Sequence, residues 1–188
     1  MFLMVCTRPD IAFTVCFLAR FCAAPQERHM HSLLRLVRYL IGTKREGVFY
    51  PARQTGKPMD FDLVGFVDAA FSDCLNTKKS TSGYLFCFNG APLTWRSSRQ
   101  TIVTTSSTEA EYVAACEGTK EAIWLRKLFE NLGFQVVDPT VLFEDNDSCR
   151  AQTENPLHHT RTKHIDIAYY FTRQMVDEGI VILRRCSI

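Results

Sequence analysis

The sequence has 188 residues, enough for one domain with a smaller attachment, and its hydrophobic (46%) and charged (22%) fractions are typical of a soluble globular protein. The net charge of +2 excludes a strong overall field for nucleic acid, so local basic clusters would have to hold such a partner. No stretch approaches the ~18 apolar residues of a membrane span. The eight cysteines include no C-x-x-C pair, which argues against zinc and predicts an intracellular protein, cytoplasmic or nuclear and not secreted.

Residues 1–45 predict a short helical segment. Two apolar stripes have helical spacing, and Pro25 separates them. The first contains Ile11, Val15, Leu18 and Cys22, and the second contains Leu33, Leu36, Val37 and Leu40 and ends at Gly42. Residues 46–60 are predicted to be a linker, because the part PARQTGKPMD has two prolines, a glycine and no apolar period.

The next third of the chain predicts strands. FDLVGFVDAAF, residues 61–71, is a nearly continuous apolar run, which is typical of a strand buried on both faces. SGYLFCF is rich in aromatic residues, and Asn89-Gly90 then predicts a hairpin turn before PLTWRS. QTIVTT could extend that strand or continue it past a bulge.

The remaining elements alternate between helix and strand. A long helix begins near Ser106 and reaches Leu132 before Gly133, and the short strand VLFED follows Pro139. A polar helix is expected from Asn146, then the helix HIDIAYYFTRQMVDEG and the strand IVILRR. This succession predicts an α/β fold, a mixed sheet flanked by helices and preceded by the helical segment.

Two aspartates end apolar strands, where an unpartnered carboxylate is costly. Asp68 follows LVGFV and Asp145 follows VLF. Asp145 alone could cap the next helix, and either residue alone favours such a structural role. Together with a glutamate at the start of the intervening helix, however, they could converge at one sheet edge. Carboxylates without His or Cys favour Mg²⁺ or Mn²⁺.

Helix geometry indicates which of the two glutamates of SSTEAEY, Glu109 or Glu111, faces the sheet. If Ser106 is the N-cap, Glu109 occupies the capping-box position, although Thr108 and Glu111 also fit such a box. From Glu111, small or apolar residues recur at helical spacing, namely Ala115, Gly118, Ala122 and Leu125. Glu111 is therefore predicted to face the sheet and Glu109 to face away from it.

These motifs resemble the pol polyprotein of copia-type LTR retrotransposons. TRPDIAF, KSTSGYLF, SSTEAEYVAA, KEAIWLR, EDNDS and RTKHIDI occur in that family's order across nearly the whole chain. The resemblance implies that residues 61–188 are similar to ribonuclease H and that residues 1–45 are the helical end of reverse transcriptase, thumb-like or connection-like. It further implies a five-stranded sheet, three strands antiparallel and two parallel, in which the first and fourth are neighbours.

The resemblance also implies a reaction, the cleavage of RNA in RNA–DNA hybrids by two Mg²⁺ or Mn²⁺ ions. By motif, Asp68, Glu111 and Asp145 are the catalytic and metal-binding residues. The sequence departs from the family at Ala70, where D-A-D-W has its second aspartate, and it lacks the polymerase motif Y-x-D-D. It also ends at Ile188, before the helix with A-D-x-x-T-K that supplies the fourth carboxylate, for which Asp166 is a weaker candidate.

Basic clusters beside the predicted edge could contact the phosphates of a hybrid, although such clusters are more often solvated surface. Their members, with one neighbouring serine, are Lys78, Lys79, Ser80, Arg96, Arg99, Arg161, Lys163 and His164. Two functions of different classes remain open. One is a ribonuclease H-type nuclease that works as part of the pol polyprotein, with no membrane partner. The other is a catalytically impaired retroelement remnant that folds and at most binds nucleic acid.

Overall fold

The computed structural model describes residues 1–52, 61–74, 76–154 and 163–186. At its centre is a five-stranded sheet in the order β3-β2-β1-β4-β5. The strands are β1 (Leu63–Ala70), β2 (Thr81–Phe88), β3 (Ala91–Arg99), β4 (Thr140–Glu144) and β5 (Val181–Arg185). β1, β2 and β3 pair antiparallel, whereas β4 is parallel to β1 and to β5. This arrangement confirms the predicted fold class.

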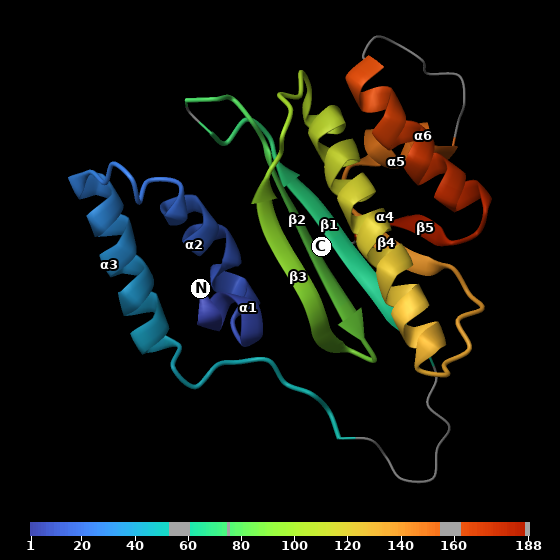
Figure 1. The fold of residues 1–188 in the computed structure, drawn as a ribbon, viewed down its shortest axis with the longest axis horizontal. Coiled ribbons are helices and arrows are strands. Elements are labelled where there is room, and N and C mark those ends of the chain that lie inside the picture. The colour runs from blue at the N-terminus through green and yellow to red at the C-terminus, as the bar shows by residue number, and fades with distance from the viewer. Residues whose placement is uncertain (53–60, 75, 155–162, 187–188) are drawn as a thin grey trace.

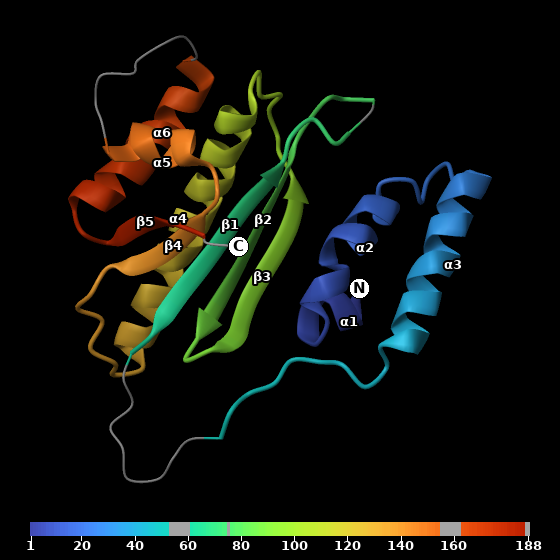
Figure 2. The ribbon, with the colours of Figure 1, turned by 180° about the vertical axis from the view of Figure 1, so that it is seen from behind.

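Helices lie on both sides of this sheet (Figure 1). On one side are α4 (Ser107–Asn131), α5 (Asp147–Glu154) and α6 (Lys163–Asp177). On the other side lies the N-terminal helical segment, seen from behind in Figure 2. It consists of α1 (Phe2–Cys6), the 3₁₀ turn η1 (Pro9–Ile11), α2 (Ala12–Ala19) and α3 (Glu27–Gly42). The sequence predicted the last two of these helices but not α1.

The hydrophobic core lies between the sheet and α4. Phe86, Leu125 and Leu142 are fully buried there, and α4 approaches the sheet so closely that a Cβ on Gly118 would lie 2.4 Å from Cγ1 of Val67. Gly133, with a φ of +87°, follows the C-cap of α4, as predicted. Asn89 and Gly90, both at positive φ, form the predicted hairpin turn between β2 and β3.

The prediction that β1 is buried on both faces is wrong. Its burial alternates, with Leu63 and Val67 against α4 and with Phe66 and Asp68 exposed on the opposite face. Alternation follows from the strand period of two residues, and the apolar side chain of Phe66 at an outward position concealed it. QTIVTT is also not part of a strand, because β3 ends at Arg99.

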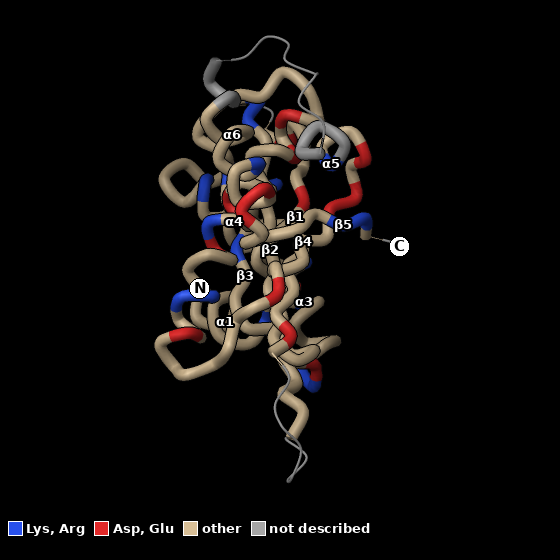
Figure 3. The backbone as a smooth tube through the Cα atoms, turned by 90° about the vertical axis from the view of Figure 1, so that its right-hand side faces the viewer, with Lys and Arg blue, Asp and Glu red and all other residues tan. Residues whose placement is uncertain are grey.

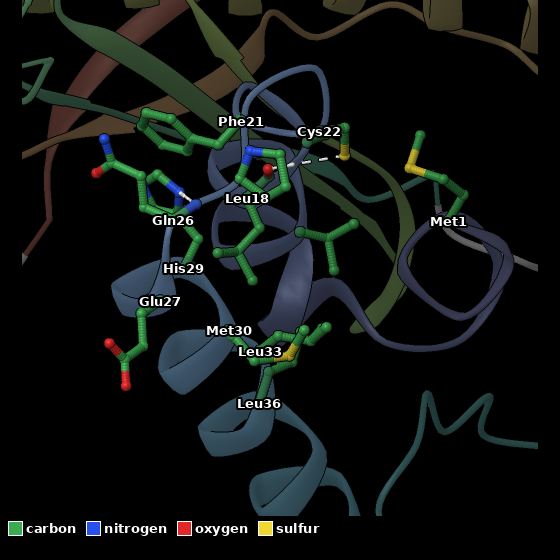
Figure 4. Close-up of a pocket in the computed structure, with 13 residues that line it drawn as sticks. Met1, Leu18, Phe21, Cys22, Gln26, Glu27, His29, Met30, Leu33 and Leu36 are labelled. Atoms are coloured by element: carbon green, nitrogen blue, oxygen red, sulfur yellow. Dashed lines mark hydrogen bonds between the residues drawn. The ribbon is translucent and has the colours of Figure 1, made fainter.

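The N-terminal helical segment has little buried apolar surface of its own, since α1 and α3 contain no buried residue. Between α2 and α3 lies an apolar groove of about 560 Å³ (Figure 4). Its lining includes Leu18, Phe21, Met30, Leu33 and Leu36. Among the described residues, no helix has the length and apolar character needed to cross a lipid bilayer.

Candidate active site

Three carboxylates from separate parts of the chain meet at one end of the sheet. One oxygen each from Asp68, Glu111 and Asp145 lie within 4.8 Å of one another. β1 and β4 are parallel neighbours that pair Phe66 with Phe143, so the residues two positions further along each strand lie side by side. Figure 3 shows acidic positions close to the junction of β1, β4 and α5. The predicted convergence is therefore present in the structure.

The start of α4 separates the roles of its two glutamates. The Ser106 hydroxyl accepts the backbone N–H of Glu109 at 3.1 Å, which makes Ser106 the N-cap. The Glu109 carboxylate in turn accepts the Thr105 hydroxyl at 2.8 Å and the Thr105 backbone N–H. Glu109 thus stabilises the helix start, whereas Glu111 is 7% exposed and faces the sheet. The sheet-facing orientation predicted for Glu111 is confirmed.

Gln100 fixes the first turn of α4 against β2. Its side-chain amide donates to Ser82 Oγ at 2.8 Å and to the Ala110 carbonyl at 2.9 Å. Gln100 is 5% exposed, and its contact with Ala110 lies one residue before Glu111. No role was predicted for Gln100, because its contacts with Ser82 and Ala110 depend on the tertiary fold.

Asp145 is exposed and does not cap the helix that follows. The N-cap of α5 is the neighbouring Asn146, whose Oδ1 accepts the backbone N–H of Cys149 at 2.9 Å. Asn146, and not Asp145, therefore caps this helix. The Asp145 carboxylate instead lies near that of Asp68.

Burial and mutual repulsion disfavour the charged forms of these carboxylates. Burial raises the pKa of Glu111 to about 8, and the charges of Glu144, Asp68 and Asp145 add to this shift. The pKa of Asp68 is also raised, by burial and then by Asp145. In the described part of the chain, the nearby ion pairs connect Asp147 with Arg150 and Arg185, and none includes the three carboxylates.

The donor set fits a divalent cation. Three hard oxygen ligands gather without a His or Cys, which favours Mg²⁺ or Mn²⁺. Oε2 of Glu111 is buried and has no hydrogen-bond partner among the described residues. A buried carboxylate oxygen in this state is costly, and a cation would satisfy it.

Sequence reasoning missed a fourth carboxylate in this region, Glu144, which is 1% exposed. Its Oε1 accepts the backbone N–H of Asn146 at 3.0 Å, and its buried Oε2 has no hydrogen-bond partner within the described part of the chain. Burial raises the pKa of Glu144 to about 8. The available signal was its alternation with Leu142, since residues two apart on a strand share a face.

The basic residues of β3 do not form one cluster. Gly83 pairs with Asp68 on one side and Ser97 on the other, so the odd-numbered residues of β3 share a face with Asp68. Arg99 is on that face, whereas Arg96 is on the face of α4, where it lies 4.0 Å from Glu117. Both arginines are exposed.

The loop between β1 and β2 carries the predicted residues 78–80. Lys78 is exposed, whereas the Lys79 ammonium donates to the Thr101 carbonyl. Ser80 is fully buried, and its hydroxyl accepts the Ser72 backbone N–H and pairs with the Thr104 hydroxyl, each at 3.0 Å. The prediction that Ser80 contacts nucleic acid is therefore corrected, because this residue stabilises the loop from inside.

Four other predicted residues cannot be placed. Arg161 lies outside the described residues. Lys163, His164 and Asp166 belong to the first turn of α6, but their side chains lie outside the described part of the structure.

Comparison with known proteins gives relatives over nearly the whole chain. The retrovirus-related Pol polyprotein from transposon TNT 1-94 of Nicotiana tabacum is 39% identical over 185 residues, which are 98% of this chain and 13% of that polyprotein. Secreted RxLR effector protein 161 of Plasmopara viticola is 44% identical over 125 residues, 66% of this chain and 84% of that protein. No protein-family model matches the chain.

Among solved structures, LC11-RNase H1 in complex with an RNA/DNA hybrid aligns with a TM-score of 0.49 and 12% identity. The alignment covers 66% of this chain and 85% of that chain.

Proposed function

Because the chain belongs to the retrovirus-related Pol polyproteins of transposons, we propose that residues 61–188 form a ribonuclease H-type endonuclease. The proposed reaction is hydrolysis of the RNA strand in RNA–DNA hybrids. Residues 1–45 would then be the helical end of a reverse transcriptase, and residues 46–60 would be a linker. The chain spans 13% of the Pol polyprotein that matches 98% of it, so polymerase activity is not assigned to it.

The convergence of Asp68, Glu111 and Asp145 within 4.8 Å carries this proposal. These residues would hold two Mg²⁺ or Mn²⁺ ions, which when bound activate a water molecule and stabilise the leaving oxygen. Glu111 is buried in the second turn of α4, which fixes its position. Asp68 and Asp145 are exposed, so a phosphodiester can approach from their side.

The hybrid would be held by phosphate contacts that read its shape and not its sequence. Arg99 is suited to this role because it is exposed on the same face as Asp68. Lys78 is exposed in the loop that follows β1. Arg161, Lys163 and His164 are further candidates by their position in the motif RTKHIDI.

A cleavage assay tests the proposal. The chain is incubated with a hybrid labelled on the RNA strand, in Mg²⁺ and in Mn²⁺, beside the variants Asp68→Asn and Asp62→Asn. We expect the wild type and the Asp62 variant to cut alike and the Asp68 variant to lose activity. Equal cutting by all three proteins would refute the site. Hybrid binding without cutting by any of them would favour the second candidate, a remnant that binds nucleic acid.

A further inference from the structure

Two buried carboxylate oxygens near the cation site have no hydrogen-bond partner among the described residues. They are Oε2 of Glu111 and Oε2 of Glu144. Glu144 is 99% buried, being 1% exposed, and it closes β4 directly before Asp145. Of the charges that raise the pKa of Glu111, that of Glu144 acts more strongly than those of Asp68 and Asp145. Both glutamates are buried, and Glu144 directly precedes Asp145, which has a carboxylate oxygen within 4.8 Å of one from Glu111.

Among the residues that the structure describes, no ion pair includes Glu111 or Glu144. Cys149 is fully buried beside both glutamates, whose charges add to the burial that raises the pKa of its thiol. Arg150 and Arg185, the cations of the described residues in this region, pair with Asp147 instead. Glu144 accepts one backbone hydrogen bond, which the Asn146 N–H donates to Oε1.

We propose that Glu144 is a positioning residue of the cation site, the fourth carboxylate that raises the affinity of Asp68, Glu111 and Asp145 for divalent cations. This inference rests on the proposed function. Glu144 does not belong to the three residues whose oxygens lie within 4.8 Å of one another, so it acts from behind Glu111 and Asp145. When a cation occupies the site and Glu144 is ionised, its negative charge would strengthen cation binding, because charges interact more strongly in a water-poor interior than in solvent.

The same carboxylate also holds its neighbours in place. Through the Asn146 N–H, Glu144 fixes the turn between β4 and α5, and this turn carries Asp145. Groups behind a metal ligand orient that ligand, and removing such a group typically lowers metal affinity by about 10- to 100-fold. The expected effect of Glu144 falls in that range.

The test is calorimetric titration of the full 188-residue chain with Mn²⁺, with circular dichroism to confirm that each variant is folded. Glu144→Gln keeps the size of the side chain and removes the charge, so we expect Mn²⁺ affinity to fall by about 10- to 100-fold. Glu144→Asp keeps the charge, so its affinity should lie closer to wild type. Glu109→Gln is the matched control on the outer side of α4, and its affinity should be unchanged.

The outcomes separate this inference from the function on which it rests. If Glu111→Gln abolishes Mn²⁺ binding while Glu144→Gln binds as wild type does, Glu144 has no role at the cation site and only the inference is overturned. If Glu144→Asp binds more weakly than Glu144→Gln, side-chain size and not charge matters, which also overturns it. A wild-type chain that binds no Mn²⁺ overturns both.

Discussion

The sheet with α4 and the N-terminal helical segment are held together by different forces. Side chains such as Phe86 and Leu125 are completely buried between sheet and helix. In the helical segment, by contrast, Leu33 and Val37 remain 43% exposed, and a few polar contacts hold the segment. Hydrophobic burial scales with apolar area, whereas a hydrogen bond contributes only about 0.5–1.5 kcal/mol net, so the first region should be far more stable.

The polar contacts of the helical segment are specific. Arg8, only 6% exposed, donates to Asp10 and to the backbone and hydroxyl oxygens of Thr43, and the Tyr39 hydroxyl donates to Asp10 at 2.8 Å. Trp95 Nε1 donates to the Met4 carbonyl at 2.6 Å, which joins β3 to α1. The motif TRPDIAF thus supplies Arg8 and Asp10 to a hydrogen-bond network that holds the helical segment together.

The largest expected difference between the two regions is in the free energy of unfolding lost when one leucine in each is replaced by alanine. Leu125→Ala opens a cavity in the core and should lower the free energy of unfolding by about 3 kcal/mol. Leu33→Ala, in the open groove, should lower it by about 1 kcal/mol or less. Urea denaturation followed by circular dichroism measures both. Equal losses would show that the two regions are stabilised alike.

A smaller effect is expected where α4 touches β1. Gly118→Ala places a methyl group 2.4 Å from Cγ1 of Val67, so the helix must shift away from the strand. Overpacking of this kind costs about 1–3 kcal/mol. Because the same helix carries Glu111, hybrid cleavage should fall as well. An unchanged unfolding midpoint together with full activity would contradict the close contact.

The two regions should also respond to pH in opposite directions. Burial holds the pKa of Glu111 at about 8, above its ordinary 4.5, so stability present below pH 4.5 is lost as pH rises toward 8. The hydrogen bond from Arg8 holds the pKa of Asp10 below its ordinary 3.8, so its contribution is present above that value and is lost on acidification.

Two measurements on the metal-free protein check these signs. Urea midpoints between pH 5 and 8 should fall with pH in the wild type and change less in Glu111→Gln. Below about pH 4, the fluorescence of Trp95 in a Trp124→Phe background should report loosening of α1, following the loss of the Asp10 carboxylate. A midpoint that rises with pH between 5 and 8 would contradict the assignment of Glu111.

The smallest expected effect is the difference in hybrid binding between variants of the two β3 arginines, Arg99 and Arg96. Arg99→Ala should weaken hybrid binding and reduce the slope of log affinity against log salt by about 1, as expected for one lost phosphate contact. Arg96→Ala, on the opposite face beside Glu117, should leave both unchanged. Fluorescence anisotropy over a range of salt concentrations gives these slopes. The reverse order would place the hybrid on the other face of β3.

Sequence reasoning succeeded where local patterns carried the information. The spacing of small residues after Glu111 identified its face, and Asn89-Gly90 and Gly133 marked a turn and a helix end. It failed where tertiary context decided. An outward Phe66 made β1 look buried on both faces, and the burial of Ser80 depended on a loop that no local pattern specifies. The burial of Glu144 followed from its alternation with Leu142, a local signal that was overlooked.

We propose that Asp68, Glu111 and Asp145 act as one cation-dependent nuclease site. Its most direct test is the cleavage rate on an RNA–DNA hybrid with each strand labelled in turn, for the wild type and for Asp68→Asn, Glu111→Gln and Asp145→Asn. We expect cutting of the RNA strand alone, dependent on Mg²⁺ or Mn²⁺, and its loss in all three variants. Cutting that persists in any of them, or that continues after the cations are chelated, would contradict it.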